Sequence, residues 1–386
     1  MQRRETLLVA ILIMVLAGSG CTSGKTGTAA SPEPARNTPS VSSSPSPIAP
    51  SVAPVDLWFA IVRPGAFSVV HDTKITKSVK GHFDVRGTYW TQDGRFALAT
   101  PSLDSGEQWL TVIEAATGKV RKIDCEGCNA IAAVGNAKIL IATYSGKLLR
   151  LDLDVQQNPV ALKTGLPQTE GRLELIGEVP NQAVVYLHAV AAPDSKKQLL
   201  YYISWDGATQ NSAYPSAKVP GPAIYARRTA YQGPRLAFAV TPWDVPCQRT
   251  DDVWLVDPAT GQATVTDASA AGPPLASGSG AAGGLGVQGL WWAADGSLHA
   301  MMQSWRCDKS KSPPEQPVDK RGDWRLDGNR WTRVGDIRSY VVLSAADGTL
   351  VSIDEKNAVN VVRGGRSTKV DASSDGASVS IAPDVS

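Results

Sequence analysis

The sequence predicts an exported all-β protein, a β-propeller of seven four-stranded blades carried on a disordered N-terminal tether. Three observations indicate this. The chain opens with a signal-peptide layout that ends at a cysteine, a segment rich in Ser, Pro and Thr follows, and the remaining chain consists of short apolar runs separated by Asp-Gly and Thr-Gly pairs. We therefore divide the chain into residues 1–20, 21–55 and 56–386.

The first segment has the features of a cleavable export signal. Arg3 and Arg4 precede an apolar core at 7–17, which is broken at once by Gly18-Ser19-Gly20. A membrane-spanning helix needs about 20 apolar residues. Because this core is much shorter, we expect a signal peptide and not a permanent transmembrane helix.

The four residues Gly18-Ser19-Gly20-Cys21 resemble the lipobox of bacterial lipoproteins, although Gly18 stands where that family usually has Leu. The resemblance implies that the Cys21 thiol receives diacylglycerol and that acyl chains such as palmitate hold the protein on the extracytoplasmic face of the cell membrane. The alternative is ordinary signal cleavage that leaves a spare cysteine.

Residues 21–55 predict a tether. They contain almost no large apolar side chain beyond the cysteine and are mainly Ser, Thr, Pro, Ala and Gly, so they cannot form a hydrophobic core and are expected to stay disordered with polyproline II character. As a coil, this length of chain spans on the order of 30 Å. It would lift the folded domain off the lipid.

The charge of residues 56–386 excludes one class of partner. Removing four basic and two acidic residues with the first 55 leaves 34 of each sign, so the domain is formally neutral. It has no basic stripe of the kind that binding to a phosphate backbone requires. We therefore expect no nucleic acid partner.

Two recurring phrases predict the repeat. One places Asp-Gly before an alternating strand, at 89–100, 291–302 and 372–383, and the other places Thr-Gly or Asp-Gly between two strands, at 109–124, 199–213 and 253–267. Asp93 and Asp295 are 202 residues apart and Asp295 and Asp375 are 80 apart, close to five and two units of about 40. This predicts seven blades, with the C-terminal strand completing a blade begun by the first strands of the domain. Six or eight units, or two sandwiches, remain open.

The phrase from Trp90 to Phe96 resembles the W-S-P-D-G-K repeat of TolB-like, WD40-like bacterial propellers. The proline of that motif is replaced by Gln92, Ala294 and Ser374 in the three copies. The resemblance implies the propeller fold and a tendency to bind partners, but no activity.

Four cysteines remain after Cys21, and an exported chain favours disulfides. Cys247 and Cys307 each follow a strand and a Trp, so we expect them to bond to each other across neighbouring loops. For Cys125 and Cys128 we expect a local structural disulfide. Redox or zinc roles are weaker alternatives, because neither a helix N-terminus nor further ligands are evident.

The sequence holds no catalytic signature. The four histidines, His71, His82, His188 and His299, are too dispersed for a recognisable metal set, and Gly278–Gly283 matches a dinucleotide-binding motif by letter only, without a preceding strand. We expect no cofactor and no metal site. Whether the protein is an enzyme stays open, with a binding role favoured.

The binding face is predicted from four long insertions, each of which follows the second strand of a unit. They are Pro101–Gln108, Ala191–Gln198, Thr241–Asp252 and Ser304–Asp323. The last two contain Trp243-Asp244 and Trp305-Arg306, residue types that dominate binding hot spots when they are exposed. The alternative is that these Trp side chains only wedge between blades.

The sequence therefore predicts a lipid-anchored scaffold that binds an envelope protein or peptide through its propeller loops. The alternatives are a solute-sensing or carbohydrate-binding lipoprotein that uses the loop Trp residues and a hydrolase with an unrecognised carboxylate site. The ligand, the oligomeric state and any catalytic activity are not fixed by the sequence.

Overall fold

The computed structural model describes the greater part of the chain from residue 56 onward. The described residues are 56–155, 158–166, 172–179, 181–188, 199–213, 224–232, 235–242, 251–257, 262–266, 268, 283–293, 295–308, 310–312, 314–319 and 321–383. The chain separates into two compact units, residues 1–51 and 52–386, and the first lies outside this set. Among the described residues there is no helix of the length and apolar character needed to cross a membrane.

The described residues form seven antiparallel sheets, which we number as blades in chain order. Each has four main strands, and β22 adds a short fifth strand beside β21 in blade 6. Blade 1 consists of β1(Trp58–Arg63), β2(Ala66–His71), β3(Lys74–Lys80) and β29(Ser378–Ile381). Blade 2 consists of β4(Phe83–Trp90), β5(Phe96–Pro101), β6(Trp109–Glu114) and β7(Val120–Asp124). Blade 3 consists of β8(Cys128–Gly135), β9(Lys138–Thr143), β10(Leu148–Asp152) and β11(Val160–Ala161). Blade 4 consists of β12(Arg172–Val179), β13(Gln182–His188), β14(Leu199–Ser204) and β15(Thr209–Ala213), and blade 5 of β16(Ile224–Gln232), β17(Arg235–Pro242), β18(Asp252–Asp257) and β19(Gln262–Thr266). Blade 6 consists of β20(Gly283–Trp292), β21(Leu298–Cys307), β22(Glu315–Pro317), β23(Gly322–Asp327) and β24(Arg330–Asp336). Blade 7 consists of β25(Ser339–Ser344), β26(Leu350–Asp354), β27(Val359–Arg363) and β28(Arg366–Asp371).

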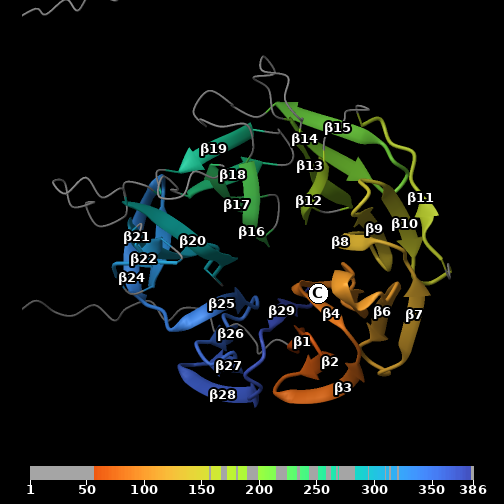
Figure 1. Cartoon of the computed structure of the whole chain (residues 1–386), viewed down its shortest axis with the longest axis horizontal. Helices are drawn as coiled ribbons and strands as arrows, with labels where there is room; N and C mark the ends of the chain where they lie inside the picture. Colours follow the sequence, from red (N-terminus) through yellow and green to blue (C-terminus); the bar gives the residue numbers. More distant parts are fainter. Residues whose placement is uncertain are drawn as a thin grey trace, which may run out of the picture. The chain divides into compact units, whose positions relative to one another are not determined.

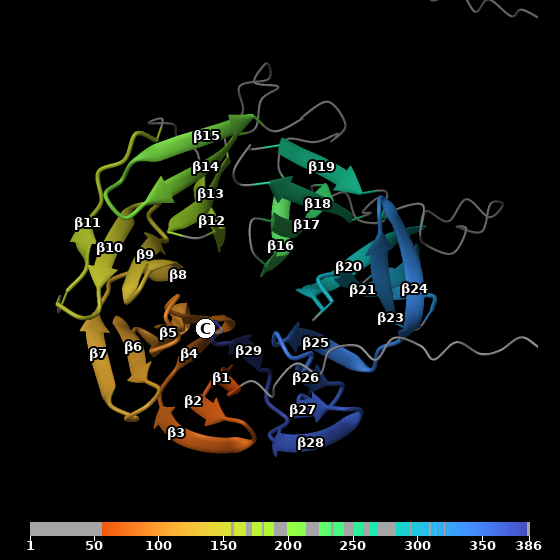
Figure 2. The same cartoon turned by 180° about the vertical axis from the view of Figure 1, so that it is seen from behind.

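Within the unit 52–386 the sheets stand radially around a centre (Figures 1 and 2), with β4, β8, β12, β16, β20, β25 and β29 innermost. Blade 1 closes the ring. Its inner strand is the C-terminal β29, which pairs antiparallel with β1 so that Ile61 lies opposite Val379. The predicted seven-bladed propeller, closed by strands from both ends of the domain, is confirmed.

The common strand order gives the blades two distinct ends. We call the "loop end" the side where second strands connect to third strands and fourth strands connect to the next blade. We call the "turn end" the opposite side, where first strands turn into second strands and third into fourth. This polarity decides which side chains can act together.

The repeated Asp-Gly pair closes turns at the turn end. In the β4–β5 turn the backbone N–H of Arg95 donates to Asp93 Oδ1 over 3.2 Å, and Gly94 has φ +65°. In the β14–β15 turn the N–H of Ala208 donates to Asp206 Oδ1 over 3.1 Å. An aspartate that accepts from the residue two positions on, followed by a glycine with positive φ, fits a tight turn between strands.

One of the quoted copies occupies a different position. Asp93 and Asp295 both lie in first-to-second-strand turns, but Asp375 lies in the β28–β29 connection at the loop end. The equivalent of Asp93 in blade 7 is Asp347, whose Oδ1 accepts from the Thr349 N–H over 2.8 Å. The predicted number of blades is confirmed, but the phrase at 372–383 does not occupy the same position within its blade as the other two copies.

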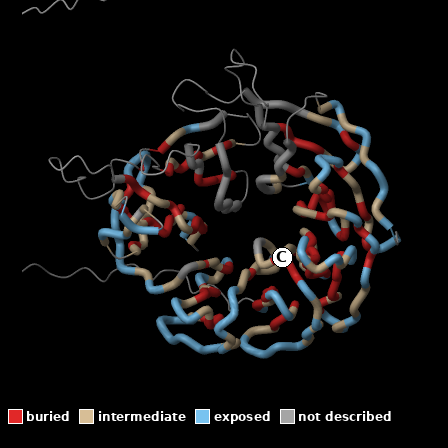
Figure 3. Tube along the Cα trace, viewed as in Figure 1, coloured by how far each residue is buried: buried red, intermediate tan, exposed pale blue. Residues whose placement is uncertain are grey.

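The hydrophobic core lies between adjacent blades. One cluster joins Val62 and Phe67 of blade 1 to Trp90, Ala97 and Ile113 of blade 2, all of them buried. Figure 3 shows exposure concentrated on the outer rim, where the residues of β28 are mainly exposed. Where the side chains are described, the blades thus bury their faces against their neighbours and leave much of the outer strand to solvent.

Candidate functional site

The described long connections lie at the loop end, as the sequence predicted. The connection from β5 to β6 includes the 3-10 helix η1(Leu103–Ser105), and the connection from β21 to β23 includes β22. The fourth insertion, predicted at Ser304–Asp323, is shorter than expected, because Ser304–Cys307 belongs to β21 and Gly322 already belongs to β23. The segments 191–198 and 243–250 lie outside the described residues.

The β5–β6 connection presents two large apolar side chains to solvent. Leu103 is 58% exposed and Trp109, the first residue of β6, is 44% exposed. Hydrogen bonds hold the backbone between them: the Ser105 hydroxyl donates to the Ser102 carbonyl over 2.7 Å, and Gly106 takes the left-handed conformation that ends η1. An apolar pair on an ordered connection is a feature typical of contact surfaces.

A disulfide lies beside this connection. Cys125, directly after β7, is bonded to Cys128, the first residue of β8, and both are buried. The Cys125 N–H donates to the Gln108 carbonyl over 2.8 Å, so the disulfide-linked segment also anchors the end of the β5–β6 connection. Burial and the absence of a helix at this position match a structural bond, because a redox pair needs an accessible thiolate.

The predicted binding residues on the third and fourth insertions have mixed outcomes. Trp305 lies within β21 and is only 7% exposed, so its expected exposure is wrong: the strand continues through it and turns its indole into the protein. Arg306, the next residue, is exposed. Trp243 and Asp244 lie outside the described residues, and the binding role of this group stays a prediction.

Cys307 is disulfide-bonded. Cys247, the partner predicted for it, lies outside the described residues, so that pairing also stays a prediction. The same holds for the lipidation of Cys21.

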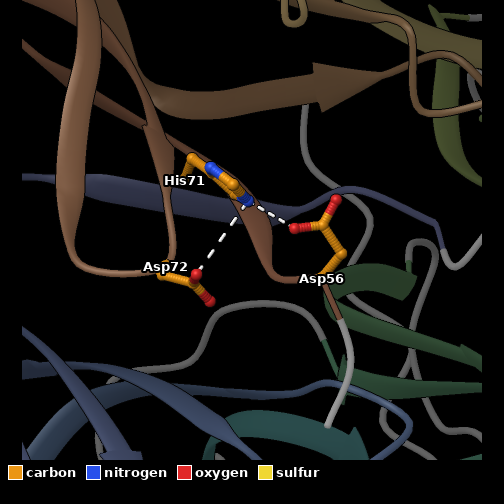
Figure 4. Close-up of side chains that lie close together, drawn as sticks. All are labelled: Asp56, His71 and Asp72. Atoms are coloured by element: carbon orange, nitrogen blue, oxygen red, sulfur yellow. Dashed lines mark hydrogen bonds and ion pairs between the residues drawn. The ribbon is translucent and has the colours of Figure 1, made fainter.

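At the turn end of blade 1, three side chains converge (Figure 4). Asp56 precedes β1, His71 ends β2, and Asp72 follows it in the β2–β3 turn with φ +54°. His71 Nε2 is hydrogen-bonded to Asp56 Oδ1 and lies 3.9 Å from Asp72 Oδ2. This bond and the indole N–H of Trp58 lower the pKa of the Asp56 carboxyl. This group could hold a metal ion.

Clustered histidines could not have indicated this group, because it contains a single histidine, His71. His71 and Asp72 are adjacent in the sequence, but Asp56 joins them only through the β1–β2 pairing, which places Trp58 opposite His71. A signal was present in the adjacent His-Asp pair at a hairpin end, yet the third residue required knowledge of the strand register.

A second group at the turn end has the order of a hydrolase triad. His299 Nδ1 lies 2.7 Å from Asp323 Oδ1, and its Nε2 lies 3.1 Å from Ser297 Oγ. The Ser297 hydroxyl, however, donates to Asp295 Oδ1 over 2.5 Å within the Asp-Gly turn. That proton is engaged by a carboxylate and not by the imidazole, so the group is arranged as turn structure and not as a nucleophile with its base.

A depression of about 560 Å³ with polar and apolar lining also opens at the turn end, between blades 3 and 4. Asn136, Lys138, Asn181 and Trp205 are among the residues that line it. The Lys138 ammonium lies 5.5 Å and the Arg150 guanidinium carbon 5.6 Å from the centroid of a Trp205 ring, which is within cation–π range.

Comparison with known proteins finds distant structural likenesses only, and the assignment of the fold rests on the strand order described above. No family model and no curated protein matches the chain. Among solved structures, apo AztD from Citrobacter koseri is similar at 12% identity, with a TM-score of 0.43 over 84% of this chain and 97% of that one. The β-propeller domain of the Trilobed protease from Pyrococcus furiosus has 10% identity and a TM-score of 0.49 over 82% and 94% of the two chains. BamB from Moraxella catarrhalis has 13% identity and a TM-score of 0.41 over 84% and 93%. At these values the likenesses say nothing of the function of this chain.

Proposed function

We propose that this chain is a lipid-anchored, extracytoplasmic binding protein whose propeller engages an envelope protein or peptide through its loop end. The single observation that carries the proposal is the exposed pair Leu103 and Trp109 on the connection from β5 to β6. A protein partner would bury this apolar surface, whereas a free monomer leaves it in water at a cost of about 25 cal/mol per Å².

The local anchoring supports the same proposal. The Cys125–Cys128 disulfide and the Ser102–Ser105 hydrogen bond fix the connection before any partner arrives. An ordered contact surface loses little conformational entropy on binding, so a few apolar side chains contribute more to affinity than they would on a mobile loop.

A carbohydrate or other small polar solute is the second candidate, and the depression between blades 3 and 4 is the observation that favours it. Its lining combines an indole with two Asn carboxamides and an ammonium group. Planar polar groups beside an aromatic ring are suited to hydroxyl-rich ligands.

In-cell chemical crosslinking followed by affinity capture and mass spectrometry tests the proposal. We expect wild-type protein to capture a reproducible envelope partner that Leu103→Ser with Trp109→Ser loses. Val155→Ser is the matched control, since Val155 is 79% exposed in the β10–β11 turn, at the turn end. Cys21→Ala should release the protein from the membrane fraction and lower capture.

Three outcomes would count against the proposal. Equal capture by the double variant and the control would contradict binding through the loop end. Cys21→Ala protein that stays in the membrane fraction would contradict a lipid anchor at Cys21. If the wild-type protein captures no other protein, the proposed protein partner is contradicted. In that last case, glycan binding by the full chain, compared with Asn136→Ala, tests the second candidate.

A further inference from the structure

We propose that Asp56, His71 and Asp72 form a binding site for a divalent transition-metal ion of the Zn²⁺ class at the turn end of blade 1. The proposal is independent of the loop-end function, because the three residues lie at the opposite end of the blades from Leu103 and Trp109.

The first argument is that the three potential ligand atoms converge. One potential ligand atom from each of Asp56, His71 and Asp72 lies within 4.8 Å of the other two. Around a tetrahedral Zn²⁺ with bonds of 2.0–2.2 Å, ligand atoms are about 3.4 Å apart. The 3.9 Å between His71 Nε2 and Asp72 Oδ2 is close to this value. The Asp56 side chain, which precedes β1, is 74% exposed.

The second argument is that groups outside the trio hold the other atoms of these side chains. The Trp58 ring stacks on the His71 ring with centroids 4.3 Å apart and planes 9° apart, and the Trp58 indole N–H donates to Asp56 Oδ2 over 3.1 Å. Arg363 donates to Asp72 Oδ1 over 3.0 Å. Partners of this kind orient metal ligands by engaging the atoms that do not face the ion.

A simple ion pair does not account for the whole arrangement. His71 Nε2 carries at most one proton, and Asp56 Oδ1 lies in its path. Asp72 Oδ2 faces the same nitrogen from 3.9 Å, beyond hydrogen-bond distance. Arg363 offsets part of the charge of Asp72 through Oδ1, and a cation held between Asp72 Oδ2 and Asp56 Oδ1 would offset the remaining repulsion between the two carboxylates.

The donor set decides the class of ion. One imidazole nitrogen and two carboxylate oxygens suit Zn²⁺ and its neighbours, whereas Ca²⁺ takes six to eight oxygen ligands and Mg²⁺ keeps an octahedron of oxygens. Three protein ligands leave at least one coordination position. Since His71 and Asp72 are also 38% and 47% exposed, that position faces solvent and the ion can exchange.

Isothermal titration of the full chain with ZnCl₂ tests the proposal. We use a Cys21→Ala background, which removes a thiol that would compete for zinc. His71→Gln and Asp72→Asn each delete one ligand, and Asn tolerates the positive φ of position 72. The matched control is His82→Gln, because His82 is also an exposed histidine paired with a carboxylate, Glu107, but lies at the loop end.

We expect one Zn²⁺ per chain, an affinity at least tenfold weaker in His71→Gln and in Asp72→Asn, and no change in His82→Gln. Co²⁺ as a visible probe should lose its protein-bound absorption in the same two variants. Melting temperatures measured in EDTA show whether a variant is still folded without metal. If His71→Gln is unfolded, Asp72→Asn provides the test alone. Absence of Zn²⁺ binding to the parent protein, or equal affinity in Asp72→Asn and His82→Gln, would overturn the proposal.

Discussion

Glu178 illustrates how single residues join neighbouring blades. It lies near the end of β12, and its Oε2 accepts a hydrogen bond of 2.5 Å from the Ala133 N–H in β8. On the other side, the Gln92 carboxamide donates to the Ala133 carbonyl over 3.0 Å. Side chains from blades 2 and 4 thus hold one residue of blade 3. Burial raises the pKa of Glu178 to about 7.

This raised pKa predicts that stability falls as pH rises. Between the ordinary Glu value near 4.5 and about 7, the folded state binds more protons than the unfolded state. The free energy of unfolding therefore decreases from pH 5 to pH 8, by on the order of 3 kcal/mol. Glu178→Gln keeps an acceptor for Ala133 and should remove most of this dependence, as urea denaturation at both pH values would show. An unchanged difference between the two pH values would contradict the assignment.

Arg63 is the corresponding residue at the ring closure. It is 5% exposed, and its guanidinium forms an ion pair of 2.7 Å with Asp371 and donates to the carbonyls of Asn357 and Asp375. These partners lie on blade 7 and on the connection that leads into β29. One side chain therefore ties β1 to the segment that delivers the closing strand.

Replacing Arg63 by Ala should lower the free energy of unfolding by about 3 kcal/mol, since it leaves a carboxylate and two carbonyls without their donor. Urea denaturation measures the loss. Arg325→Ala is the control, because the ion pair of Arg325 with Asp327 is exposed, and exposed pairs contribute about 0–1 kcal/mol. Equal losses in the two variants would show that Arg63 does not secure the closure.

At the scale of strands and turns, repeated glycines are not equivalent. Gly207 and Gly296 both have positive φ in turns at the turn end, +89° and +78°. A Cβ on Gly207 would lie 2.1 Å from the Lys163 carbonyl oxygen, whereas a Cβ on Gly296 would meet nothing within 4 Å. Only the first turn is packed against another backbone segment.

Gly296→Ala should therefore cost about 1–2 kcal/mol, the strain of a left-handed alanine. Gly207→Ala should cost clearly more, because the Lys163 backbone must also move. The difference between the two melting temperatures measures this packing effect. Equal melting temperatures would mean that Lys163 does not lie against the turn.

The same elements show how far the sequence predicts the structure. Alternating strands and Asp-Gly turns sufficed for the fold, because these signals are local. They did not separate Asp375 from Asp347, since a phrase of a few letters does not reveal which end of a blade it occupies. The group of Asp56, His71 and Asp72 depends on strand register, and the burial of Trp305 depends on where β21 ends. Neither is encoded in local spacing.

At the scale of the whole domain, the two ends of the blades are built differently. Tight turns built on Asp-Gly pairs occupy one end, whereas connections of variable length, such as those from β5 to β6 and from β21 to β23, occupy the other. In repeat architectures such variable connections commonly gather on the binding face. The account therefore assigns the protein partner to the loop end and the metal ion to the turn end.

Site-specific photo-crosslinking in living cells tests the central claim most directly, with a photoreactive amino acid placed at position 103 in one strain and at position 155 in another. Both native side chains are highly exposed, at 58% and 79%, but they lie at opposite ends of the blades. The account predicts one defined crosslinked envelope protein from position 103 and none from position 155. Crosslinks to the same protein from both positions, or only from position 155, would contradict a loop-end binding face.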